Sequence, residues 1–241
     1  AASDVYKGRS GLAGGVVQGR ARRFLQHAQD GTWELRDDVR CSGALEGSGS
    51  RAVWTPGRDL LFLAEGRDAE GRPARASIEG NTEDGRSFHA RGAEIRYQET
   101  GRLAVDEDAY LSFRQPGEEV PAELWGDQVE LGKTSGWALG QARFQTADAQ
   151  GAAGRIDWTR YPGEGDLLLL VEDASITRGQ VQASGPHLEI DTRTDTITCI
   201  GTEDLPATLR AEDGRIAVGL WLRYHLSSGR FESRGARFET P

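Results

Sequence analysis

The chain has 241 residues, a normal length for one all-β unit. Its 37% of hydrophobic residues is low for a protein with a thick core, and its formal net charge of −9 argues against binding to nucleic acid through a basic patch. No apolar run approaches the roughly 18 residues of a membrane-spanning helix. The longest, DLLLLVED at 166–173, has the length of a strand. With 32 glycines and 8 prolines, the composition predicts many turns and little helix.

We expect the first 19 residues to form a flexible N-terminal lead-in. The glycine-rich stretch GLAGGVVQG at 11–19 lacks the strand-then-helix context of a dinucleotide-binding loop. The chain contains no methionine, and its Ala-Ala-Ser start is compatible with secretory cleavage and with removal of an initiator residue.

From residue 20 onward one pattern recurs. It consists of a small residue, an apolar–polar–apolar strand, a polar turn and a second alternating strand. Because successive side chains of a strand point to opposite faces, each copy has one apolar and one polar face. Stacked copies predict an apolar interior and a charged exterior. The last apolar residues of the first strands, 27 to 43 residues apart, are Leu25, Trp54, Tyr97, Leu131, Trp158, Ile190 and Tyr224.

Acidic pairs recur just after strand-like runs. A stacked column of carboxylates would suit calcium. The spacing of an EF-hand or of a calcium-binding nonapeptide repeat is absent, however. We therefore expect solvated turns at Asp37-Asp38, Glu107-Asp108, Glu172-Asp173 and Glu203-Asp204.

Other residues that carry chemistry in proteins stand alone in this sequence. Cys41 and Cys199 fall on the apolar phase of strands, and we expect both to be small buried residues without a disulfide. The stretch GKTSG at 132–136 lacks the first glycine of a phosphate-binding loop. The four histidines have no metal-ligand spacing, and no nucleophile motif is present. We therefore expect neither a cofactor nor a metal, and no enzyme.

The repeated unit resembles the OstA-like repeat of periplasmic lipopolysaccharide-transport proteins of the LptA and LptC type. The copies that match best are 92–113, 153–176, 183–200 and 217–238, and with weaker copies the resemblance covers about residues 20–240. It implies an all-β, folded-over antiparallel β-jellyroll (β-taco) of stacked repeats, with little helix, as a single domain over 20–241. The chain departs from the family in its length and in the glycine-rich stretch at 64–86, so the particular family member stays open.

The resemblance also implies a function. The chain would be a periplasmic carrier or bridge component, its signal or anchor removed, that shields the acyl chains of lipopolysaccharide or a similar lipid on the way to the outer membrane. It would pair end to end with other OstA-like envelope proteins through terminal strands. The inward rows expected to contact lipid are Trp54, Phe62, Ile95, Tyr97, Leu103, Val105, Ile156, Trp158, Leu168, Leu170, Leu188, Ile190, Ile197, Leu222 and Tyr224.

Two other functions fit the same pattern. The rows could close on each other as the dry core of a structural β-solenoid, a scaffold or filament protein. A β-helix enzyme that cleaves sugars would need two paired carboxylates, and nothing in the sequence singles out such a pair.

Overall fold

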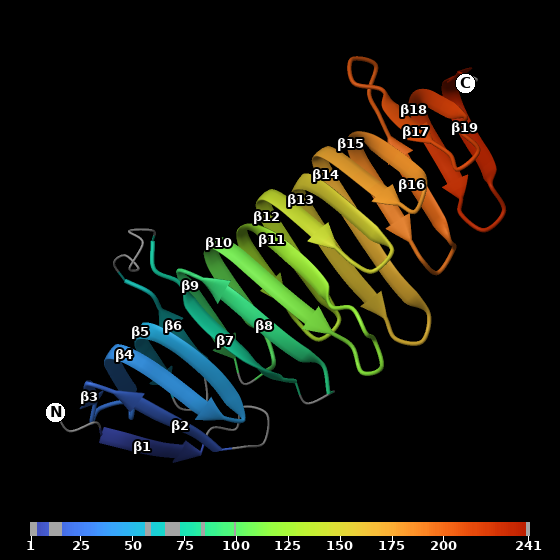
Figure 1. Cartoon of the computed structure of the whole chain (residues 1–241). Coiled ribbons are helices and arrows are strands. Elements are labelled where there is room, and N and C mark those ends of the chain that lie inside the picture. Colours follow the sequence, from blue (N-terminus) through green and yellow to red (C-terminus); the bar gives the residue numbers. More distant parts are fainter. Residues whose placement is uncertain are drawn as a thin grey trace. The chain divides into compact units, whose positions relative to one another are not determined.

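The computed structural model describes residues 4–9, 16–55, 59–65, 73–82, 85–98 and 100–239, and every regular element in them is a strand (Figure 1). The all-β fold class expected from the sequence is thereby confirmed. The chain divides into two compact units, Ala1–Lys133 and Thr134–Pro241, called unit 1 and unit 2. The single domain expected over 20–241 stays a prediction.

Unit 1 is an antiparallel sheet. Its described strands are β1 (Asp4–Arg9), β2 (Val16–Ala21), β3 (Arg23–Gln26), β4 (Trp33–Gly43), β5 (Leu45–Thr55), β6 (Asp59–Leu63), β7 (Ala76–Asn81), β8 (Ser87–Gly92), β9 (Glu94–Gln98), β10 (Leu103–Arg114) and β11 (Ala122–Leu131). Strand β1 and the first part of β2 lie within the segment 1–19, for which the sequence predicted a flexible lead-in; that call stays a prediction.

Unit 2 is antiparallel as well. Its described strands are β12 (Ser135–Gln145), β13 (Ala149–Tyr161), β14 (Gly165–Arg178), β15 (Val181–Asp191), β16 (Thr196–Ile200), β17 (Ala207–Arg210), β18 (Ile216–His225) and β19 (Arg230–Glu239).

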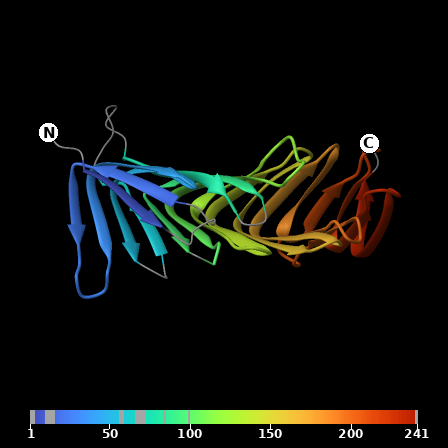
Figure 2. The ribbon, with the colours of Figure 1, turned by 90° about the horizontal axis from the view of Figure 1, so that it is seen from below.

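In each unit the sheet folds over into two layers, because its long strands turn a corner halfway (Figure 2). Strand β10 pairs with β9 through Leu103–Asp106 and with β8 through Tyr110–Arg114. We call the two layers leg A and leg B. In unit 1, leg A runs β3–β4–β5–β6–β9–β10–β11 and leg B runs β1–β2–β4–β5–β7–β8–β10–β11.

Unit 2 has the same plan. Its leg A runs β12–β13–β14–β15–β16–β18–β19, and in its leg B strand β17 replaces β16. The folded-over, jellyroll-like architecture expected from the sequence is therefore present in each unit.

Three of the four acidic pairs form corners, not turns between strands. Asp37-Asp38, Glu107-Asp108 and Glu172-Asp173 lie inside β4, β10 and β14, each at a shift in strand register. All six residues have positive φ angles, between 51° and 68°. Aspartate, which supplies four of the six, is among the few residues that tolerate this left-handed region. The expectation of turns was wrong for these pairs, because a bulge bends one continuous strand.

Large side chains of one leg reach across the interior to small residues of the other. A Cβ atom added to Gly47 in leg B would lie 2.8 Å from Cζ of Phe62 in leg A and 3.2 Å from Cγ2 of Ile78. Phe62 and Ile78 are both fully buried. The interior of unit 1 is thus closely packed at this level, as protein cores are.

Candidate functional site

The residues predicted to contact lipid all lie on the inner face of leg A. Thirteen of the fifteen are at most 8% exposed, and Trp54 and Leu168 are half-buried. In unit 1 they lie in two cross-strand rows that include Trp54–Leu60–Tyr97–Leu103. The structure brings them together as rows, whereas their contact with lipid stays a prediction.

In unit 2 the rows cross five neighbouring strands. One contains Trp158, Leu168, Ile190, Ile197 and Tyr224 as successive cross-strand partners. The other contains Ile156, Leu170, Leu188, Cys199 and Leu222.

The residues predicted from the sequence do not include the second layer that encloses the interior. The interior is bounded by leg B as well, whose larger buried side chains include Ile78, Phe88, Leu111 and Phe113 in unit 1 and Phe144, Ile176, Val181 and Leu209 in unit 2. The signal for this layer was available. After the corner of β10 the alternation resumes in the same phase, from Val105 to Ala109, Leu111 and Phe113.

The inner face is reachable from solvent at β3–β5 in unit 1. Phe24, Trp33 and Trp54 are half-buried there, with ring centroids 5.2 Å apart for Phe24–Trp33 and 6.1 Å for Trp33–Trp54. Phe24 and Trp33 were absent from the predicted rows. Aromatic rings at such a position offer a large apolar surface.

The inner face of unit 2 is reachable at its last strand. On β19, Phe231 packs against Tyr224 with centroids 5.0 Å apart and against Phe238 at 5.7 Å. Phe238 is 53% exposed. Strand β19 forms its ladder with β18, which leaves its other side as a sheet edge among the described residues.

An arginine bridges the two legs on the side opposite the corner in each unit. Arg86, between β7 and β8 of leg B, donates from Nη1 to the carbonyl oxygen of Gly132 at 3.4 Å, after the leg A end of β11. In unit 2, Arg215 donates from Nη2 to the carbonyl oxygen of Gly229 at 3.3 Å. Each hydrogen bond contributes modestly to stability, so these closures are weaker than the corners.

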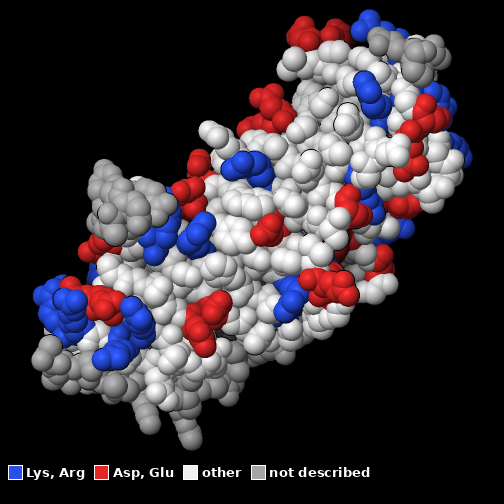
Figure 3. Space-filling model, in the orientation of Figure 1, with Lys and Arg blue, Asp and Glu red and all other residues white. Residues whose placement is uncertain are grey.

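The outer face is less uniformly charged than predicted. On the face drawn in Figure 3, acidic and basic side chains are scattered between wide areas of other residues. In β14, Leu167 and Leu169 face outward and are half-buried. Asp191 is a further exception to a charged, exposed exterior: it is 6% exposed, and its carboxylate forms an ion pair with Arg193 at 2.8 Å.

Both cysteines are free and buried, as the sequence predicted. Burial raises the pKa of the Cys41 and Cys199 thiols to about 12. Because the thiolate is the reactive form, we expect neither to react with a maleimide at pH 8 until denaturant is added. Mass spectrometry measures the labelling, and a Ser228→Cys variant, with its cysteine at an exposed position, should label at once. Fast labelling of native Cys199 would contradict the packing described here.

Among the described residues, no group of three or more His, Cys, Asp or Glu side chains is placed to hold a metal ion. The described residues also contain no helix that is long and apolar enough to cross a membrane.

The fold and its inner rows define an all-β protein of folded-over antiparallel sheets with an apolar interior. No protein-family model matches the chain, and no curated protein matches it. Among solved structures, it is similar to LptH of Pseudomonas aeruginosa, described as the LptA homologous periplasmic component of the conserved lipopolysaccharide transport device. The identity is 12% and the TM-score 0.43, over 51% of this chain and 96% of that chain. A likeness of this degree identifies neither a family nor an activity for this chain.

Proposed function

We propose that this chain is a non-catalytic lipid carrier of the cell envelope. It shields the acyl chains of lipopolysaccharide or a similar lipid between its two legs, while the sugar part of the lipid stays in water. The observation that carries the proposal is the aromatic cluster Phe24–Trp33–Trp54, half-buried at one end of an otherwise buried apolar face.

Energetics favour acyl chains as the occupant of this interior. Each buried CH₂ group contributes about 0.8 kcal/mol, so a chain of a dozen carbons gains roughly 9 kcal/mol on leaving water. An acyl chain entering between the legs replaces contacts between side chains by contacts with itself, so little apolar surface becomes wet. Entry from the side releases the bonds of Arg86 to Gly132 and of Arg215 to Gly229, and it leaves the strand ladders intact.

The edge strands suit assembly with neighbours. An unpaired strand edge is a template for pairing with another chain. Strand β19 offers such an edge, next to the exposed ring of Phe238. In this proposal the chain works in the periplasm, joined end to end with other OstA-like envelope proteins. The energy for directed transport comes from such a partner.

Photo-crosslinking in cells that make lipopolysaccharide tests the proposal. A benzophenone amino acid replaces Trp54 in one variant and Tyr224 in another. The matched controls carry it at Val53 and Arg223, the outward neighbours on the same strands. We expect lipid adducts at 54 and 224 and none at 53 and 223. Equal labelling of both faces, or no adduct in a folded protein, would contradict a lipid interior.

A closed, dry scaffold is the second candidate function, and the packing of Phe62 against Gly47 favours it. Such a protein assembles through its edges but takes up no lipid. It therefore predicts no adduct at any of the four positions, together with assembly of the purified chain into longer particles.

A further inference from the structure

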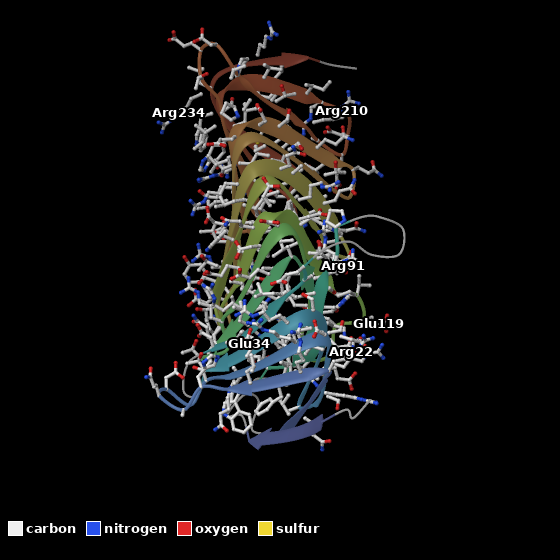
Figure 4. The ribbon with its side chains drawn as sticks, turned by 90° about the vertical axis from the view of Figure 1, so that its left-hand side faces the viewer. Arg22, Glu34, Arg91, Glu119, Arg210 and Arg234 are labelled. Carbon is white, nitrogen blue, oxygen red and sulfur yellow. The ribbon has the colours of Figure 1, made fainter. Side chains whose placement is uncertain are left out.

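The outer face of leg B in unit 1 carries an aromatic ladder that the proposed lipid site does not use. Across β7, β8, β10 and β11, the residues Ser77, Arg91, Tyr110 and Trp125 are successive cross-strand partners. They point away from the interior, since their strand neighbours Ile78, Ala90, Leu111 and Leu124 are the buried ones. Figure 4 labels Arg91, whose exposed side chain lies at the edge of the ribbon.

The side chains of the ladder contact one another. The ring of Tyr110 lies 5.7 Å from that of His89 and 5.6 Å from that of Trp125, measured between centroids. The guanidinium carbon of Arg91 lies 5.7 Å from the Tyr110 ring centre. The Tyr110 hydroxyl donates to Oε1 of Glu123 at 2.6 Å. Both Tyr110 and Trp125 are only half-buried, so part of each ring remains open to solvent.

A polar hollow adjoins the ladder. Its volume is about 490 Å³, and its polar lining comes from Asp38, Arg40, Glu46, Ser48, Ser77 and Glu79. Ser77 joins the two features, because its Oγ lies 3.1 Å from Nε2 of His89. Over three strand spacings of about 4.8 Å, Ser77 to Trp125 spans roughly 15 Å.

The charges of the hollow narrow the class of ligand. Glu46 and Glu79 are direct cross-strand partners and both are exposed. Like charges opposite each other destabilise a sheet, so this pair lowers the stability of the fold. Strand pairing alone gives no reason for keeping it. Three carboxylates against the single guanidinium of Arg40 repel an anion. The same oxygens accept hydrogen bonds from uncharged hydroxyl groups.

We propose that this outer face binds a neutral oligosaccharide. The C–H face of a pyranose carries partial positive charge, which is attracted to the negative face of the Tyr110 and Trp125 rings. Sugar hydroxyls donate to Glu123 and to the carboxylates of the hollow, and they accept from Arg91. Packing between strands accounts for the ring contacts alone. It accounts neither for the hollow beside them nor for the facing pair Glu46 and Glu79.

Titration of the whole chain with cellohexaose, maltohexaose and chitohexaose, followed by calorimetry, tests the proposal, with trigalacturonate as the acidic comparator. At least one neutral hexasaccharide should bind, and trigalacturonate should not. Trp125→Ala should weaken the neutral sugar at least tenfold. Tyr110→Phe keeps the ring but loses the hydroxyl, and it should weaken binding of the neutral sugar about threefold. Trp137→Ala removes a half-buried outward tryptophan of unit 2 and should leave the affinity unchanged.

The double variant Glu46→Ala/Glu79→Ala changes only exposed residues, so we expect it to fold. It can replace Trp125→Ala in the test if that variant does not fold. It should also weaken the neutral sugar at least tenfold. Binding of no neutral hexasaccharide, preference for trigalacturonate, or affinity unchanged in the folded variants would overturn the proposal. None of these outcomes bears on lipid binding, because the ladder lies on the outer face of leg B and the lipid rows lie on the inner face of leg A.

Discussion

Replacing Leu188 by alanine should lower the free energy of unfolding of unit 2 by about 2–5 kcal/mol, the usual cost of truncating a fully buried leucine. Leu188 is 0% exposed. It lies between Leu170 of β14 and Cys199 of β16 in the inner row of leg A. The loss of stability has two parts. The alanine buries less apolar surface than the leucine, and it leaves a cavity that the two legs cannot close. Chemical denaturation followed by circular dichroism measures it.

Leu188→Asp should go further and prevent unit 2 from folding, because a carboxylate buried without a partner costs more than a domain's usual margin of stability. The matched control is Glu189→Ala, one residue along on the outer face, which should change stability by no more than about 0.5 kcal/mol. If Leu188→Ala behaved like its control, the two legs would not be packed together as described.

Replacing Glu34 by glutamine should destabilise unit 1 by about 1–3 kcal/mol at neutral pH, since charged hydrogen bonds are among the stronger ones. Glu34 is 4% exposed, and its carboxylate accepts a hydrogen bond from Nε of Arg36 at 2.7 Å and another from Arg51. Figure 4 labels Glu34 in β4. The hydrogen bond from Arg36, with a further contribution from Arg51, holds the pKa of Glu34 below its ordinary value of 4.5.

The sign of the pH dependence follows from that depressed pKa. A carboxyl group with a lower pKa in the folded state contributes stability that is fully present above its unfolded pKa and is lost as the pH falls through its folded pKa. The difference between wild type and Glu34→Gln should therefore be largest at neutral pH and vanish in acid. Unfolding curves at several pH values measure it. Glu94→Gln, which breaks the more exposed pair with Arg96, should cost little at any pH. A Glu34→Gln effect that grew in acid would contradict this assignment.

Sequence alternation was enough to predict leg A. Ile95 and Tyr97 alternate with charged neighbours, and the structure buries both on the inner face. The same signal predicted the buried cysteines, because Cys199 shares the phase of Ile197.

The corners could not be predicted in the same way. A pair such as Glu107-Asp108 has the composition of a turn, and composition does not tell a turn that reverses the chain from a bulge that bends it. The distinction depends on which strands lie beside β10 on either side of the bend, and these are separate strands, β8 and β9. Phe24 was missed because its short strand RFLQ places two apolar residues side by side, so alternation does not tell which one faces inward. Trp33 could have been found, because it alternates with Leu35 in β4. Within the run of leucines in β14, the predicted rows contained Leu168 and Leu170, and these are the two that face inward.

The corners also govern how such a protein can change length. Each long strand crosses from one leg to the other. Strand β12 therefore ends in leg B, and β15 begins in leg B. Excising β13 and β14 together would leave β12 antiparallel to β15, with every inner residue still facing inward. Excising one strand alone would reverse the direction of all that follow. The length of the interior can therefore change only by pairs of strands, in steps of about 9.6 Å.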